Sequence, residues 1–270
     1  GATWNDPVTT PAEFSLSTPT SIKIIYATVY LATTVDGQVL FTSDGGTTWN
    51  SNSDLLGNSL SDCIGLSPTK IIAVGNQGKI GWSNNAGSTL TSLETRITNQ
   101  ELWGVHHNGN NLVAVGDGGS ILLSNNSGQT WSLSNSGSTE NLKSVVVINP
   151  NTAVAVGSNG TILKTTNTGG SWALVGSGYS DNINFIHRLP NGTLYAVGDN
   201  DLILMSTDDG NTLNFTTTSF TGFQYNFRDI YFTSNDTGFI ATNSAEIITT
   251  DDGGQNWYLR MTGLFGQMTC

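Results

Sequence analysis

The sequence is poor in positive charge and in long apolar stretches. Nine Lys and Arg residues stand against 20 Asp and Glu residues, which gives a formal net charge of −11. Nucleic acids and anionic lipid surfaces attract concentrated positive charge, and no basic cluster occurs in the chain. The apolar runs, such as 145–148, are too short to cross a bilayer. We therefore expect no nucleic-acid partner and no direct membrane insertion.

Cysteine is scarce as well. The two cysteines, Cys63 and Cys270, are too few for a disulfide framework or a cysteine-rich metal site. Cys63 lies in an apolar segment, which predicts a buried thiol, and Cys270 is the last residue of the sequence. A bridge between them stays open at this point, because sequence alone does not place them within bonding distance.

Helical patterns are missing too, since no stretch keeps apolar residues at the 3.6-residue spacing over a useful length. The chain instead contains 32 Gly, many Ser, Thr and Asn, and only 11% charged residues. This composition is typical of many short strands joined by tight turns.

One eight-residue pattern returns six times along the chain. The copies are TSDGGTTW (42–49), SNNAGSTL (83–90), SNNSGQTW (124–131), TTNTGGSW (165–172), STDDGNTL (206–213) and TDDGGQNW (250–257). Their acidic or amide positions are Asp44, Asn85, Asn126, Asn167, Asp208 and Asp252. Successive copies are 41, 41, 41, 41 and 44 residues apart, which indicates that the chain is built from repeated structural units.

Each repeat has the same internal order of apolar and turn segments. A first β-branched run occurs at 22–26, 60–66, 102–106, 142–148, 183–186 and 227–232. A second run such as IIAVG or LYAVG follows, then a Gly- or Asn-containing hairpin turn, a short third run, the recurrent motif and a fourth run. Four antiparallel strands in 41 residues make one blade of a β-propeller.

We therefore predict an all-β fold, a single propeller over 1–270 with six four-stranded blades. The alternative is seven blades, because GATW at 1–4 matches the last half of the motif. Residues 1–20, with Pro7, Pro11 and Pro19, are expected to form an outer strand and a connection. Such a strand completes a blade whose other strands lie at the C-terminal end or in another chain.

The stretch AVAVGSNGTILKTTNTGGSW at 153–172 resembles the Asp-box, or BNR, repeat, and is most similar to proteins like the photosystem II assembly and stability factor. This resemblance covers nearly the whole chain. It implies that the motif closes the turn between the third and fourth strands, with Asp or Asn accepting backbone N–H groups and Trp packing between blades. The family includes sialidases, other glycosidases, sorting receptors, lectins and assembly factors, so it does not decide the function.

The motif itself is expected to be structural, with no bound metal. Three of the six acidic or amide positions are Asn, and no ladder of calcium ligands surrounds them. Ligands of propellers usually bind the opposite face, where the first strands begin and the second and third strands are joined. The turns there carry Asp36, Asn76, Asp117, Asn159, Asp199 and Glu246.

The first strands contribute Lys23 and the five candidate ligand-binding residues of that face. These five are Trp103, Lys143, Asn184, Tyr225 and Arg228. Stacking and hydrogen bonding by this set suit a sugar or a peptide. The alternative is that Trp103 and Tyr225 pack between blades and the charged groups are solvated.

Catalysis is not expected, and neither is a cofactor. A sialidase needs three arginines around a carboxylate, and the arginines here are Arg96, Arg188, Arg228 and Arg260, of which at most two are suitably placed. Asp62, Asp181 and Asp229 are near the starts of first strands and are the candidates for a glycosidase carboxylate pair. Asp residues at strand edges are also common turn formers.

The function that the sequence favours is a non-catalytic binding or scaffold propeller that recognises a glycan or a protein partner. The alternatives are an assembly factor for a membrane protein complex, similar to the photosystem II factor, a structural component of a virion or surface filament, and a sialidase-like glycoside hydrolase. Few lysines and many Asn, Ser and Thr residues favour an extracytoplasmic place: extracellular, periplasmic or lumenal, or on a virion surface. An oligomer or larger assembly is compatible with the sequence.

Overall fold

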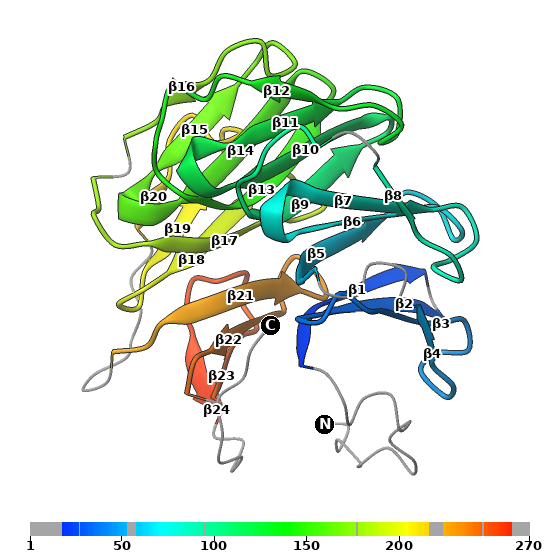
Figure 1. The fold of residues 1–270 in the computed structure, drawn as a ribbon. Helices are drawn as coiled ribbons and strands as arrows, with labels where there is room; N and C mark the ends of the chain where they lie inside the picture. The colour runs from blue at the N-terminus through cyan, green and yellow to red at the C-terminus, as the bar shows by residue number, and fades with distance from the viewer. Residues whose placement is uncertain are drawn as a thin grey trace.

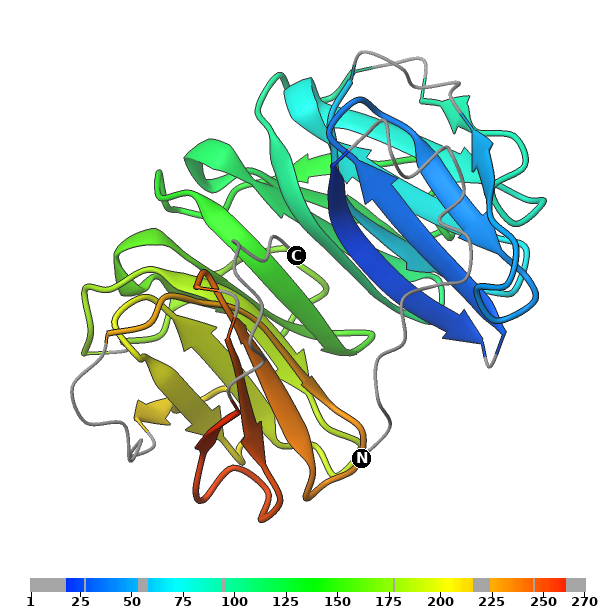
Figure 2. The same ribbon diagram turned by 90° about the horizontal axis from the view of Figure 1, so that it is seen from below.

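The computed structural model describes residues 18–26, 28–52, 58–93, 96–176, 178–215, 224–244 and 246–260. These residues form six four-stranded antiparallel sheets, each built from four consecutive strands. The sheets follow one another in chain order around a ring, as the colour gradient shows in Figure 1 and, from below, in Figure 2. The prediction of a six-bladed β-propeller is confirmed.

The strands are grouped below by their place in a sheet. The first strands are β1 (Pro19–Tyr26), β5 (Leu60–Gly65), β9 (Leu102–Asn108), β13 (Leu142–Asn149), β17 (Ile183–Arg188) and β21 (Phe227–Phe232). The second strands are β2 (Val29–Thr34), β6 (Ile71–Gly75), β10 (Asn111–Gly116), β14 (Thr152–Gly157), β18 (Leu194–Gly198) and β22 (Gly238–Thr242). The third strands are β3 (Val39–Thr42), β7 (Lys79–Ser83), β11 (Ile121–Ser124), β15 (Ile162–Thr165), β19 (Ile203–Ser206) and β23 (Ile247–Thr250). The fourth strands are β4 (Asn50–Asn52), β8 (Thr91–Ser92), β12 (Ser132–Ser134), β16 (Ala173–Leu174), β20 (Asn214–Phe215) and β24 (Tyr258–Arg260).

Most strand starts agree with the sequence, and the first strand is the exception. β5, β9, β13, β17 and β21 begin where the apolar runs predicted, whereas β1 begins at Pro19 rather than at Ile22. Residues 1–20 were expected to form an outer strand and a connection, but Pro19 and Thr20 belong to β1. The rest of that prediction, apart from Thr18, lies outside the described residues, as does Cys270.

Most second strands, such as β6 and β18, are apolar along nearly their whole length because sheets cover both of their faces. All five residues of β6 and of β18 are buried. The glycine that ends these strands is required by a close approach: a Cβ on Gly157 would lie 2.0 Å from the carbonyl oxygen of Asn141. The AVG signature of the repeat is thus a packing requirement.

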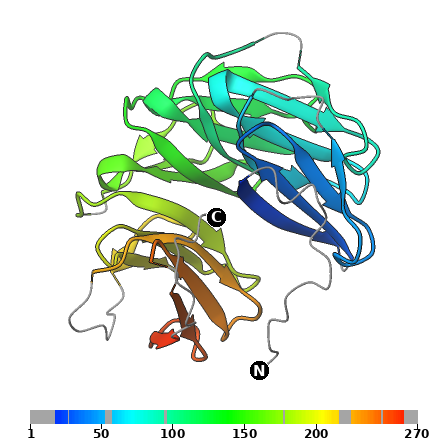
Figure 3. The ribbon, with the colours of Figure 1, turned by 60° about the horizontal axis from the view of Figure 1, so that its bottom comes forward.

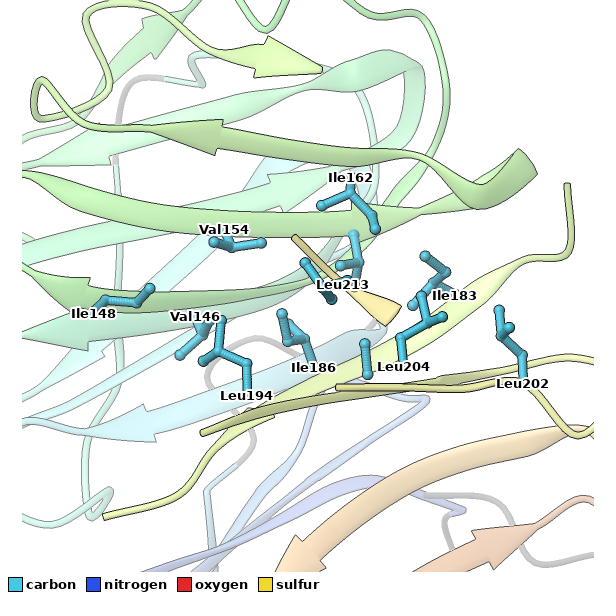
Figure 4. Close-up of a cluster of buried hydrophobic side chains, with 12 residues drawn as sticks. Val146, Ile148, Val154, Ile162, Ile183, Ile186, Leu194, Leu202, Leu204 and Leu213 are labelled. Carbon is cyan, nitrogen blue, oxygen red and sulfur yellow. The ribbon is translucent and has the colours of Figure 1, made fainter. Parts of the chain in front are cut away.

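Apolar clusters hold neighbouring sheets together. The boundary between the fourth and fifth sheets contains Val146, Val154 and Ile162 from one side and Ile183, Leu194 and Leu204 from the other (Figure 4). Similar clusters lie at the four other boundaries between consecutive sheets, from the first to the sixth. Cys63 belongs to the cluster between the first and second sheets, where it is buried as a free thiol.

The recurrent motif forms the connection between the third and fourth strands in each of the six sheets. In the third sheet the Ser124 hydroxyl donates to Asn126 Oδ1 at 3.0 Å, and the Thr130 N–H donates to the same oxygen at 3.0 Å. The equivalent pair of bonds recurs in the other five turns. One side-chain oxygen therefore organises each turn, whether it belongs to Asp or Asn.

Candidate functional site

The second residues of four first strands form a series at one end of the ring. They are Trp103 on β9, Lys143 on β13, Asn184 on β17 and Arg228 on β21. Consecutive first strands contact one another, so the repeat places these side chains on neighbouring blades at the same height. We call Trp103, Lys143, Asn184 and Arg228 the rim row.

Three members of the rim row are in direct or electrostatic contact. Lys143 Nζ donates to Asn184 Oδ1 at 2.6 Å, and the Asn184 amide donates to the Phe227 carbonyl at 2.7 Å, next to Arg228. Burial lowers the pKa of Lys143, the Arg228 charge acts in the same direction, and Asp199 opposes both. Two neighbouring cations, of which Arg228 is exposed, create a place where an anionic group would be stabilised.

Trp103 continues the row from the third blade. Its side chain is 41% exposed, and its indole N–H donates to Asp117 Oδ1 at 2.7 Å. The next residue, Gly104, lets β9 approach β13 closely, because a Cβ there would lie 3.0 Å from the Lys143 carbonyl oxygen. The indole is therefore anchored by a hydrogen bond to a carboxylate, on the strand next to the one that carries Lys143, and still offers apolar surface to a ligand.

Tyr225 does not join the rim row. It lies two residues before β21, is 5% exposed and packs in the cluster between the fifth and sixth sheets. Its backbone N–H donates to Asp201 Oδ1 at 2.8 Å. Of the five candidate residues, four lie at equivalent places on neighbouring first strands, and Tyr225 packs in the core.

The turns that carry the predicted outer set of acidic and amide residues also join neighbouring blades. The turns after the second strands donate backbone N–H groups from Gly118, Asn159 and Asn200. Each N–H group forms a hydrogen bond with the side-chain oxygen of an asparagine just before the next first strand: Asn141 at 2.9 Å, Asn182 at 3.3 Å and Asn226 at 3.2 Å. These asparagines were not among the residues predicted from the sequence, although their fixed place before the first strand repeats three times.

Lys23 is not on the rim but inside the ring. Its Nζ lies 3.3 Å from Asp62 Oδ1 and 5.3 Å from the centre of the Phe185 ring. Burial acts to lower the pKa of Lys23, but the carboxylates of Asp62 and Asp229 outweigh it and raise that pKa. Burial also raises the pKa of Asp229, against the effect of Lys23. This cluster joins the first, second, fifth and sixth sheets.

Asp62, one of the candidate glycosidase carboxylates, has both oxygens engaged. Oδ1 accepts the Cys63 N–H at 2.9 Å and the Ser21 hydroxyl at 3.0 Å, and Oδ2 accepts the Val105 N–H at 3.1 Å. Asp181, the third candidate, accepts the Asn200 amide at 2.6 Å, near the outer turns. Asp62 thus holds strands and Asp181 holds a turn.

A hollow of about 560 Å³ lies on the opposite face, beside the motif turns of the third and fourth sheets. Its lining is mainly Asn, Ser and Thr, with Asn125, Asn151 and Thr168 among them. Trp131 also lines it but is only 9% exposed and donates its indole N–H to the Gly128 carbonyl at 3.1 Å. The hollow therefore lacks a stacking platform of the kind that Trp103 provides.

Within the described ranges, no group of three or more His, Cys, Asp or Glu side chains is placed to hold a metal ion. The same part of the chain contains no helix with the length and hydrophobicity needed to span a bilayer.

The chain was compared with known families, curated sequences and solved structures. No family model and no curated protein matches it. A structure of YCF48 from Cyanidioschyzon merolae is similar, with 18% identity over 93% of this chain and 87% of that chain and a TM-score of 0.72. YCF48 bound to D1 peptide is also similar, with 16% identity over 91% and 81% and a TM-score of 0.70.

An ancestral GH74 enzyme gives a TM-score of 0.66 at 17% identity, over 90% of this chain and 38% of that chain. Identities this low show the fold alone. The similarity does not show that this chain belongs to the Asp-box family. It also does not show that this chain shares the functional sites of these proteins.

Proposed function

We propose that this chain is a non-catalytic binding propeller whose rim row recognises an extended, acidic segment of a protein partner. The observation that carries the proposal is the contact of Lys143 with Asn184 beside Arg228, with the exposed indole of Trp103 at the equivalent place on the neighbouring first strand. Two cations suit a carboxylate, and the indole suits an apolar side chain of the same peptide. The solved complex of the similar YCF48 with D1 peptide supports peptide binding by this kind of propeller.

The engagement of Asp62 supports a non-catalytic role. A glycosidase needs one carboxyl group as an acid and a second as a base or nucleophile. Asp62 accepts hydrogen bonds at both oxygens and faces Lys23, so it is held as a structural carboxylate. The Asn-, Ser- and Thr-rich composition supports an extracytoplasmic location as part of the same proposal.

The test is a peptide array of acidic, neutral and basic decapeptides probed with the labelled chain, followed by calorimetry on the acidic peptides that bind. Lys143→Ala and Arg228→Ala should each weaken binding about tenfold, as expected for charged contacts at the centre of an interface. Trp103→Ala should weaken it by a similar factor.

Arg260→Ala is the matched control, because it removes the same charge from the exposed end of β24. It should leave the affinity unchanged. Binding that survives all three rim variants, or a ligand found only on a parallel glycan array, would contradict a peptide site on this rim.

A further inference from the structure

Two hollows occupy equivalent places on the face of the ring that carries the motif turns. The larger is the hollow described above, between the third and fourth sheets, and the smaller, of about 370 Å³, lies between the second and third sheets. Five positions that line the smaller hollow recur in the lining of the larger one, each 41 residues later. They are Lys70, Trp82, Asn84, Ser127 and Gly128, which correspond to Asn111, Leu123, Asn125, Thr168 and Gly169. The same structural unit therefore builds both hollows.

The motif turn of the third sheet separates the two hollows. Ser127 and Gln129 line the smaller hollow, whereas Asn125 and Thr130 of the same turn line the larger one. Figure 3 shows the second, third and fourth sheets, coloured cyan to green, following one another around the ring. The hollows thus lie on either side of one turn, which suits a ligand made of repeating units.

The lining of both hollows is almost uncharged. Among the described residues, no Asp or Glu side chain lines either hollow, although the chain contains 20 of these residues. Lys70 is the one charged residue that the structure describes in the smaller lining, and Asn111 takes its place in the larger. A cationic ligand would find no carboxylate there, and the net charge of −11 repels polyanions. The linings therefore favour a neutral, polar ligand.

The amide side chains at the hollows are available to such a ligand. Within the motif turn, the Asn126 amide is occupied, since it donates to the Thr130 hydroxyl at 2.7 Å. The exposed side chains of Asn84, Gln129 and Asn125 have no hydrogen-bond partner within the described ranges. Each of these amides offers a donor and an acceptor side by side, which matches two neighbouring hydroxyl groups.

Trp82 supplies the flat apolar surface that the larger hollow lacks. It is half-buried, packs on the apolar cluster between the second and third sheets and lines the smaller hollow. Its indole N–H has no partner in the part of the chain that the structure describes, whereas that of Trp131 donates to the Gly128 carbonyl. A pyranose ring has a C–H face that packs on an indole and hydroxyl groups at its edge that bond to amides.

We propose that the two hollows are neighbouring subsites for a neutral oligosaccharide. Trp82 packs against one sugar ring in the smaller hollow, and Asn84, Gln129 and Asn125 bond to hydroxyl groups along the sugar chain. The smaller volume of about 370 Å³ is within the usual size of small-molecule sites. A sugar suits these linings better than a peptide, because they consist mainly of hydroxyl and amide groups and offer few apolar side chains. The site lies on the face opposite the rim row and does not depend on peptide binding there.

The test is calorimetry of the full chain with cellohexaose, laminarihexaose, mannohexaose and chitohexaose, and with hexagalacturonate as the anionic probe. We expect at least one neutral hexasaccharide to bind and hexagalacturonate to bind more weakly. Shortening the bound sugar to three units should weaken binding about tenfold, because one subsite is then empty. Asn125→Ala should weaken the hexasaccharide more than the trisaccharide, since Asn125 lines only the larger hollow.

Trp82→Leu should weaken hexasaccharide binding about tenfold through the loss of the aromatic surface. This variant should fold, because Leu123 holds the same place in the next repeat. Gln129→Ala should weaken binding about fivefold, as expected for one lost hydrogen bond. Gln255→Ala is the matched control, because Gln255 has the same place in the sixth motif and lines neither hollow. It should leave the affinity unchanged.

Binding of none of the four neutral hexasaccharides at millimolar concentration would overturn the proposal. Tighter binding of hexagalacturonate would also overturn it, as would an affinity that Trp82→Leu and Gln129→Ala leave unchanged. Each of these results would leave the rim row untouched, since peptide binding there is measured separately with Lys143→Ala and Arg228→Ala.

Discussion

At the scale of single residues, one carboxylate organises each acidic motif turn. Asp44 is exposed, yet its carboxylate accepts the Thr48 hydroxyl at 2.6 Å and the Thr48 N–H at 2.9 Å. These bonds, led by the Thr48 hydroxyl, lower the pKa of Asp44 from its ordinary 3.8 to about 2. The Thr212 N–H and the Ser206 hydroxyl lower the pKa of Asp208 to about 2 in the same way. The folded state therefore keeps both carboxylates charged at a pH where the unfolded chain binds protons.

We predict that Asp44 and Asp208 make the protein sensitive to acid between about pH 4 and pH 2. A depressed pKa contributes stability above the unfolded value, and this contribution is lost as the pH falls through the folded value. The melting temperature, followed from pH 6 to pH 2, should fall less steeply in the double variant Asp44→Asn, Asp208→Asn. Asn126 already accepts the equivalent N–H in its own turn, so the double variant should fold. An unchanged slope would show that other groups carry the acid sensitivity.

At the scale of the turn, two neighbouring positions with similar backbone angles have different roles. Gly128 has φ +80°, and a Cβ there would lie 2.5 Å from Cδ1 of Ile72 in the preceding sheet. Gly45 has φ +75° with no described atom within 4 Å of a Cβ, and Ala86 holds the same place in the second turn at φ 58°. At the second glycine of the motif, the lack of a side chain thus lets neighbouring blades pack closely. The residue before it only has to adopt a left-handed backbone conformation.

We predict that Gly128→Ala costs about 2–4 kcal/mol of unfolding free energy, the sum of backbone strain and overpacking against buried Ile72. Gly45→Ala should cost about 1 kcal/mol, because only the backbone term applies. Urea unfolding of the two variants isolates the packing term. Equal losses of unfolding free energy in the two variants would mean that the motif glycine is not needed for packing one blade against the next.

The strands could be predicted from the sequence because each one repeats its pattern at a fixed interval. The rim could be predicted only in part, since a residue's place depends on where its strand begins. β1 begins at Pro19, so Lys23 is its fifth residue, inside the ring, whereas Lys143 is the second residue of β13. Tyr225 precedes its strand and is covered by a neighbouring sheet, a tertiary effect that no local pattern reports. The asparagines before the first strands were missed because their partners lie on the previous blade.

At the scale of the whole molecule, Lys23 joins the two ends of the described chain. It forms an ion pair with Asp62 on β5, lies over Phe185 on β17 and stabilises the Asp229 carboxylate on β21. Its side chain is 27% exposed, and that of Asp62 is 12% exposed, so solvent screens the ion pair only in part.

Removing this cation would leave two partly desolvated carboxylates inside the ring. We predict that Lys23→Met lowers the unfolding free energy by about 2–4 kcal/mol, somewhat less than for a fully buried pair. Lys79→Met, which removes the same charge from β7, should change it by less than about 0.5 kcal/mol. Adding Asp229→Asn to Lys23→Met should recover part of the loss, because one uncompensated charge is then gone. Hydrogen exchange should speed up in β1 and β21 together, because both ends depend on one ammonium group; faster exchange in β1 alone would show that Lys23 secures only its own blade.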